Sequence, residues 1–248
     1  MKFLTILFFL GVVAKMFGAT YTSNFPILEN PISESGNWIN GEVTGLDWAN
    51  VRTTPGMAVG TQSGTASGNA RYADSTAVLT GAWGPNQTAQ ATIAVINASG
   101  SSSVYEEVEL RLRTTITANS ISGYEINCSV SINPHLFYLQ IVRWNGPLGS
   151  FTVLKGVYGA HAVNGDVLKA TISGSTITLY LNREKKAQVT DDTYNSGSPG
   201  IGFFLQGATG LNANFGFSNF SATDGLLPAP SPTPSATPHA GTLRGKGG

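Results

Sequence analysis

The sequence contains few charged residues and no excess of either sign. Charged side chains make up 11% of the 248 residues, and 14 Lys plus Arg balance 14 Asp plus Glu, whereas a typical soluble domain is roughly 25% charged. Binding to nucleic acid needs a concentration of Lys and Arg, because neutralised phosphates supply most of the affinity. The sequence therefore predicts no nucleic-acid partner, and Ser, Thr, Asn and Gly provide most of its polar surface.

Cysteine is also scarce. Cys128 is the single cysteine of the chain, so the domain contains no intramolecular disulfide. Its hydrophobic core must hold it together, and a hydrophobic fraction of 41% is ample for that, since a domain of about 200 residues buries roughly 70% of its unfolded surface.

The longest apolar run stands at the start of the chain and is too short to span a membrane. Lys2 precedes an apolar stretch from Phe3 to Val13, the order of charged and hydrophobic regions found in secretory signal peptides, and a spanning helix needs about 20 apolar residues. We predict a signal peptide over residues 1–19, cleaved after Ala14 or Ala19. The mature protein is then secreted, extracellular or held at the cell surface, without a membrane span. The alternative is an apolar N-terminal strand of the domain.

Amphipathic helices are missing between Thr20 and Gly225, because Gly, Pro, Thr and Ser interrupt every window long enough to form one. Short alternating segments separated by turn residues recur instead, which is typical of an all-β domain. The expected strands are Asp47–Thr53, Met57–Gly60, Ala70–Ala73, Ala89–Asn97, Val104–Thr114, Gly123–Ile132, His135–Trp144, Ser150–Lys155, Val167–Ser173, Thr176–Asn182, Ile201–Leu205 and Asn212–Ala222. A two-sheet antiparallel jelly-roll β-sandwich is the simplest architecture for about twelve to thirteen strands. We predict one such domain over residues 20–225, followed by a disordered Pro/Ser/Thr-rich linker or tail over 226–248.

The hairpin of Val104–Thr114 and Gly123–Ile132 has the clearest alternation. Matching the apolar faces of the two strands fixes their register. The pairs expected to lie opposite each other are Leu110 with Ile126, Leu112 with Tyr124, Arg111 with Glu125, and Glu109 with Asn127. The hairpin therefore has one apolar and one polar face, and the functional residues are expected on the polar one.

Four segments together resemble a known superfamily. GYEINCSVSI, LFYLQIVRWNG, NGDVLKATISGSTITLYLN and SGSPGIGFF are similar to the concanavalin A-like lectin/glucanase superfamily, and nearest to its laminin-G-like jelly rolls. The resemblance covers most of residues 21–224 and rests on glycine turns and strand alternation, so it reports the fold better than the function. It implies a β-sandwich whose concave sheet often carries a carbohydrate site. Catalytic members place a Glu-x-Asp-x-x-Glu series on one strand, and the nearest text here, Glu106–Arg111 (EEVELR), lacks the central Asp. The strand motifs of polysaccharide lyases are not matched either.

A glycan site needs aromatic rings beside planar polar groups, because a pyranose ring offers an apolar face and many hydroxyls. The predicted substrate-binding residues are four on the polar face of the hairpin and three rim aromatics: Arg111, Arg113, Glu125, Asn127, Trp144, Tyr158 and Tyr194.

No catalytic residue is assigned, although Glu107 and Glu109 stand two apart on one strand, about 6.5–7 Å by strand rise. Glycosidases use two carboxyl groups roughly 5–9.5 Å apart. Asn127 and Arg111 beside Glu109 are expected to lower its pKa, which disfavours general-acid work. The competing interpretation is an ordinary solvated sheet face with an exposed Arg111–Glu125 pair of little energetic value.

No metal or other cofactor is assigned. A calcium ion is the one cofactor left open, with Asp191 and Asp192 as ligands.

Three functions stay open at this point. The first is a secreted, non-catalytic carbohydrate-binding (lectin-like or adhesion) module that recognises an extracellular glycan or polysaccharide on its concave sheet. The second is an enzyme, a glycoside hydrolase or polysaccharide lyase acting on an extracellular polysaccharide. The third is a structural surface or matrix protein.

Overall fold

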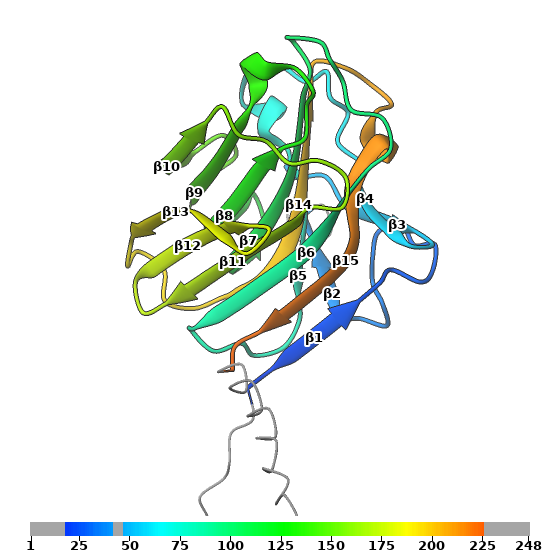
Figure 1. Ribbon diagram of the computed structural model, residues 1–248. Coiled ribbons are helices and arrows are strands. Elements are labelled where there is room, and N and C mark those ends of the chain that lie inside the picture. Colours follow the sequence, from blue (N-terminus) through cyan, green and yellow to red (C-terminus); the bar gives the residue numbers. More distant parts are fainter. Residues whose placement is uncertain (1–17, 42–46, 226–248) are drawn as a thin grey trace, which may run out of the picture.

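The computed structural model describes residues 18–41 and 47–225, and these form a β-sandwich (Figure 1). Nearly all of the predicted signal peptide and the whole predicted tail therefore lie outside the described residues. The first sheet has the strand order β13 (Glu184–Thr190), β12 (Thr176–Leu181), β11 (Val167–Ser173), β6 (Gln87–Val95), β15 (Phe215–Thr223), β4 (Met57–Gly60) and β3 (Val51–Thr54), with β1 (Thr20–Ser23) also paired to β15. The second has the order β10 (Phe151–Tyr158), β9 (Tyr138–Gly146), β8 (Ser120–Ser129), β7 (Tyr105–Thr117), β14 (Ser198–Gln206), β5 (Ser75–Leu79) and β2 (Trp38–Asn40). Short 3-10 helices are η1 (Gly68–Tyr72), η2 (Pro134–Leu136) and η3 (Asn212–Asn214).

Every strand pairing in both sheets is antiparallel. Neighbouring strands such as β6 and β15 are far apart in sequence, so the chain passes repeatedly between the two layers. Figure 1 shows the sheets stacked one over the other, with β12, β11, β6 and β15 in the nearer layer. The prediction of a two-sheet antiparallel jelly-roll sandwich is confirmed.

The predicted register of the central hairpin is also confirmed. Strands β7 and β8 pair Leu110 with Ile126 and Arg111 with Glu125. The two other expected pairs, Leu112 with Tyr124 and Glu109 with Asn127, are present as well. Apolar alternation was sufficient here, because a slip of one residue would have turned every apolar side chain of the strand away from the core.

Four strands were not predicted, and one predicted strand is wrong. Short or polar segments form β1, β2, β5 and β13, which pair because neighbouring strands offer unpaired backbone groups and not because of their own alternation. The predicted strand Ala70–Ala73 lies mostly in the 3-10 helix η1. Within residues 18–41 and 47–225, no helix has the length and hydrophobicity needed to cross a membrane.

The main core lies between the sheets and includes fully buried rings such as Phe203 and Phe217, whose centroids are 5.3 Å apart. A second, smaller apolar cluster lies on the opposite, outer face of the second sheet. It is built from Trp48, Ile121 and Trp144, with partly buried Tyr72 and Phe151 packed against it. The outer face of this sheet is thus covered in part by loops, and this covering forms the site described below.

Gly123 provides a test of the β7–β8 pairing. Its φ is +139°, and a Cβ atom there would lie 2.6 Å from the Thr114 Cα. Gly174, in the tight turn between β11 and β12, has a φ of +56° but no described atom within 4 Å of such a Cβ. We expect Gly174→Ala to lower the free energy of unfolding by about 1 kcal/mol through backbone strain alone, and Gly123→Ala by about 3 kcal/mol because a steric clash is added. Urea denaturation of both variants measures this, and equal losses would contradict the backbone placement of Gly123.

Candidate functional site

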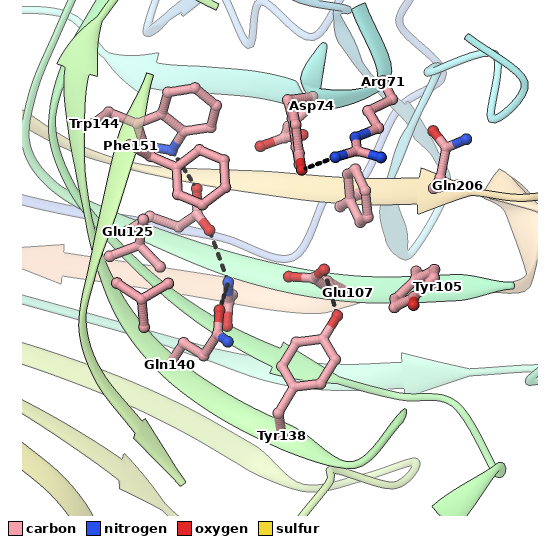
Figure 2. Close-up of a pocket in the computed structure, with 15 residues that line it drawn as sticks. Arg71, Asp74, Tyr105, Glu107, Glu125, Tyr138, Gln140, Trp144, Phe151 and Gln206 are labelled. Atoms are coloured by element: carbon pink, nitrogen blue, oxygen red, sulfur yellow. Dashed lines mark hydrogen bonds between the residues drawn. The ribbon is translucent and has the colours of Figure 1, made fainter. Parts of the chain in front are cut away.

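A cavity of about 380 Å³ lies on the outer face of the second sheet. It is floored by strands β7, β8, β9 and β14 and walled by residues near η1 and the start of β10 (Figure 2). Its lining residues are Arg71, Tyr72, Asp74, Tyr105, Glu107, Glu125, Asn127, Tyr138, Gln140, Val142, Trp144, Phe151, Val153, Phe204 and Gln206. Ligand sites in proteins typically occupy roughly 300–1,000 Å³, so the cavity is large enough for a small ligand or one or two units of a longer one.

Strand alternation positions the polar floor. Val108, Leu110 and Ile126 face the core between the sheets, so every second residue of these strands, including Glu107 and Asn127, faces outward into the cavity. The pairing of Asn127 with Gln140 continues the polar surface onto β9.

Aromatic rings form a continuous wall. The centroid of Trp144 lies 5.8 Å from that of Trp48 and 5.4 Å from that of Phe151. Tyr72 follows at 5.1 Å from Phe151 and stacks on Phe204 at 6.4 Å, with 16° between the ring planes. Because most of these contacts are edge-to-face or tilted, which aromatic pairs favour, the wall is a packed unit that holds its shape without a ligand.

The charged core of the site is the Arg111 cluster, defined here as Arg111 with Asp74, Glu109 and Glu125. Arg111 and Glu109 are completely buried. The Nη2 of Arg111 donates to a carboxylate oxygen of Glu109, and its Nη1 lies 2.7 Å from Glu125 Oε2. Asp74 is more distant, with 3.6 Å between its Oδ2 and Nη2. Burying a guanidinium is costly unless carboxylates pair with it, so these contacts hold Arg111 in place beneath the cavity.

The three carboxylates of this cluster are also close enough to hold a cation. Asp74, Glu109 and Glu125 each place one oxygen within 4.8 Å of the others. The guanidinium of Arg111 lies against all three, however, and repels a second cation. The arrangement therefore serves Arg111 and does not fit a metal ion.

Glu107 stands at the edge of this cluster and has an unusual protonation equilibrium. Burial, reinforced by the negative charge of Glu125, raises the pKa of Glu107 to about 8, although a hydrogen bond from Tyr138 and the charge of Arg111 act in the opposite direction. The Tyr138 hydroxyl donates to Glu107 Oε1 at 2.5 Å (Figure 2). Near neutral pH the Glu107 carboxyl therefore carries a proton, which it can donate into the cavity.

Burial also raises the pKa of Asp74 and of Glu109 well above the ordinary carboxyl range, and the attraction of Arg111 does not outweigh it. For Arg111 the balance is reversed, because its carboxylate neighbours raise its pKa despite burial. The cluster thus contains one permanent positive charge and more carboxyl groups than that charge can keep ionised.

Several lining side chains present hydrogen-bond acceptors without a donor. Asp74 Oδ1, Asn127 Oδ1 and Gln206 Oε1 are buried and have no hydrogen-bond partner among the described residues. The orientation of the Asn127 amide is fixed, because its Nδ2 donates to Glu125 Oε1 at 2.9 Å. A bound molecule that brings hydrogen-bond donors to these oxygens would satisfy them.

Four of the predicted binding residues come together here. Glu125, Asn127 and Trp144 line the cavity, and Arg111 lies directly beneath them. The indole N–H of Trp144 donates to Glu125 Oε2 at 2.5 Å, so the ring and the carboxylate hold each other in place.

The other three predicted binding residues lie elsewhere. A β-bulge shifts the register after Leu112, and the Arg113 side chain is turned away to donate to the backbone carbonyls of Pro85, Tyr194 and Gly174. Tyr194 packs against the ring of Tyr124 at 5.7 Å, and Tyr158, at the end of β10, is 72% exposed. None of these three residues lines the cavity; Arg113 instead links loops together.

Glu107 and Glu109, suggested as a pair of carboxyl groups, differ in their access to the cavity. Glu107 lines the cavity, whereas Glu109 is fully buried against Arg111 and does not. Arg111 does act to lower the pKa of Glu109, but the expected net lowering is wrong, because burial outweighs this attraction and raises the pKa. The alternative of an ordinary solvated sheet face is wrong as well, since Arg111 and Glu109 are inaccessible to solvent.

The suggested calcium ligands do not fit a metal site. Asp191 Oδ1 accepts a hydrogen bond from the Tyr124 hydroxyl at 2.6 Å, and Asp191 Oδ2 forms an ion pair with Arg143 Nη1 at 2.6 Å. Burial acts to raise the pKa of Asp191, but the hydrogen bonds from Tyr124 and Thr193 and the charge of Arg143 lower it below its ordinary value. Both oxygens thus serve structural contacts, and Asp192 is an exposed neighbour.

Sequence reasoning missed most of the lining residues. Tyr138 and Gln140 could have been found, because they alternate with the core residues Leu139 and Ile141 on a strand predicted to be covered on both faces. Tyr105 could also have been found, because it lies two residues before Glu107 on the predicted strand Val104–Thr114 and so shares its face. No local pattern brings the remaining polar and aromatic lining residues to this sheet face, namely Arg71, Tyr72, Asp74, Phe151, Phe204 and Gln206.

The raised pKa of Glu107 predicts how stability depends on pH. The unfolded chain ionises this carboxyl near its ordinary pKa of 4.5, and the folded chain near 8. Between these values the folded state binds more protons, so stability falls as pH rises. We expect the thermal midpoint to decrease from pH 5 to pH 8 and Glu107→Gln, which retains an acceptor for Tyr138, to reduce the slope. A slope unchanged in Glu107→Gln would contradict this assignment; Glu184→Gln, an exposed carboxylate on β13, is the matched control.

Comparisons with known proteins place the fold. No family model matches the sequence, and no curated protein matches it significantly. Among solved structures, the carbohydrate recognition domain of Emp46p in its metal-free form superposes with a TM-score of 0.54 at 12% identity, covering 84% of this chain and 97% of that chain. A mutant of the GH43 protein BlXynB from Bacillus licheniformis gives a TM-score of 0.52 at 13% identity over 82% of this chain and 39% of that chain.

These likenesses, at such low identity, concern the fold alone. They agree with the two antiparallel sheets and with the motifs in the sequence. The chain has the two-sheet antiparallel β-sandwich fold that these structures share.

Proposed function

We propose that the protein is a secreted, non-catalytic carbohydrate-binding module and that its glycan occupies the cavity on the outer face of the second sheet. One observation carries the proposal: an aromatic wall faces a polar floor within one cavity of about 380 Å³. Sugars need both surfaces, because their C–H faces stack on aromatic rings and their hydroxyls form hydrogen bonds. The unpartnered acceptors of Asp74, Asn127 and Gln206 suit a ligand rich in hydroxyl donors.

Related folds support this choice without deciding it. The printed description of the Emp46p structure is a carbohydrate recognition domain, and the BlXynB structure is a GH43 protein. Secretion rests on the apolar segment Phe3–Val13, and an extracellular glycan or polysaccharide is accordingly the proposed partner.

Tyr105 offers a direct test of the proposed site. It lines the cavity and is 37% exposed, so a bound sugar can reach its ring. Once a glycan array has identified a ligand, we expect Tyr105→Ala to weaken binding at least about tenfold, which corresponds to ~1.4 kcal/mol, as measured by calorimetry. The matched control is Tyr158→Ala, which removes an exposed tyrosine that does not line the cavity. Equal loss in both variants would contradict the location, and an array without any bound glycan would contradict the function.

A second candidate function, cleavage of the glycan, is favoured by Glu107. Its pKa of about 8 keeps it protonated near neutral pH at the cavity surface, as a general acid requires. Asp74 and Glu125 line the same cavity and are the carboxyl groups that would take the second role.

Cleavage is tested by incubating the protein with a panel of polysaccharides and measuring released reducing ends. If the protein is an enzyme, Glu107→Gln is expected to reduce the rate at least about a hundredfold, while Glu184→Gln retains it. Absence of product from the unmodified protein would reject cleavage and leave the binding module.

A further inference from the structure

The cavity carries an excess of acidic groups. Asp74, Glu107 and Glu125 line it, and Glu109 lies beneath. Facing them is one buried cation, Arg111, and among the described lining residues Arg71 is the one Lys or Arg side chain. Arg71 lies on the exposed side of η1, where its Nη2 donates to the Tyr72 hydroxyl at 2.6 Å. Burial keeps Glu107 protonated near neutral pH when no ligand is bound, but a cation placed among these carboxyl groups stabilises their ionised form. The cavity therefore suits a positively charged guest.

The hydrogen-bonding groups agree with the charges and are an independent observation. Asp74 Oδ1 and Asn127 Oδ1 belong to side chains that are less than 5% exposed, and neither oxygen has a partner among the described residues. A protonated amine offers three N–H donors and no acceptor. It therefore satisfies such oxygens, whereas the carbonyl of an acetamide or a carboxylate would place another acceptor against them.

Aromatic rings complete a site for a cation. The faces of aromatic rings carry negative charge density and attract ammonium groups within about 6 Å. Tyr72, Trp144 and Phe151 lie in contact along one wall, and Tyr105 and Tyr138 flank Glu107. Figure 2 shows Asp74 on one side of the cavity and Glu107 with Tyr138 on the other, so that a bound amine would have acid groups on both sides.

We propose that the glycan recognised in this cavity is an amino sugar with a free, protonated amine. This inference rests on the proposed function and narrows it to one substrate class. The ring stacks on the aromatic wall, and the ammonium group points toward Asp74 and Glu107. Uronic acids and sulfated sugars are disfavoured by the same charges.

Three matched ligands test the proposal. Oligomers of glucose, of glucosamine and of N-acetylglucosamine with the same β-1,4 linkage differ at one substituent, which is a hydroxyl, an ammonium or an acetamide in slightly acidic buffer. We expect calorimetry to show at least tenfold tighter binding of the glucosamine oligomer than of either neutral one. Added salt should reduce that preference only slightly, because buried charges are screened much less than exposed ones.

Two variants test which carboxyl group is responsible for the preference for the ammonium group. Glu107→Gln removes one acid group and retains an acceptor for Tyr138, so the ratio of the affinity for the glucosamine oligomer to the affinity for the neutral oligomers is expected to fall at least about fivefold. Glu184→Gln, at an exposed residue that does not line the cavity, should leave the preference unchanged.

The outcomes separate this inference from the function on which it rests. Neutral oligomers that bind as tightly as the glucosamine oligomer, or a glycan array that selects only neutral or acidic sugars, would overturn the amino-sugar assignment and retain glycan binding. No binding of any glycan would overturn both. Displacement of the oligomer by an equal concentration of methylammonium chloride would show that an amine alone suffices and would also overturn the assignment to a sugar.

Discussion

The buried guanidinium of Arg111 is the interaction on which the candidate site depends. A charge without solvent access is stable only where neighbouring groups replace its hydration. Glu109 and Glu125 provide that replacement from the two strands of one hairpin, and Asp74 approaches from the loop before β5. The same contacts fix Glu125, which in turn accepts from Trp144 and Asn127. The floor and the wall of the cavity are thus coupled through one cation.

This coupling also sets the chemistry that the cavity offers. One guanidinium cannot keep all surrounding carboxyl groups ionised, and burial raises the pKa of Asp74, Glu107 and Glu109. Glu107 is the member of this set that faces the cavity without a direct ion pair to Arg111. A protonated Glu107 can act as a general acid, and it can equally lose its proton when a cationic ligand binds beside it. A binding module and an enzyme can share a preference for a charged ligand. Measurement of released product therefore separates these two functions better than ligand preference does.

Much of the fold could be predicted from the sequence, and about half of the site. The register of β7 and β8 followed from apolar alternation, and four of the seven predicted binding residues are at or directly beneath the cavity. Arg113 was misplaced because the β-bulge after Leu112 interrupts the two-residue period. Tyr72, Asp74 and Phe204 come from a 3-10 helix, a loop and a distant strand, and local patterns carry no information about which loops meet over a sheet.

The sequence by itself determined which side of each central strand is apolar, because one face must be buried against the other sheet and a shift of one residue would reverse it. It could not determine what covers the opposite, polar face. Tertiary structure decided that, by bringing Trp48, Tyr72 and Phe151 over the outer face of the second sheet. Removal of water then reversed the expected direction of the pKa of Glu109, because desolvation acts only once distant segments have packed together.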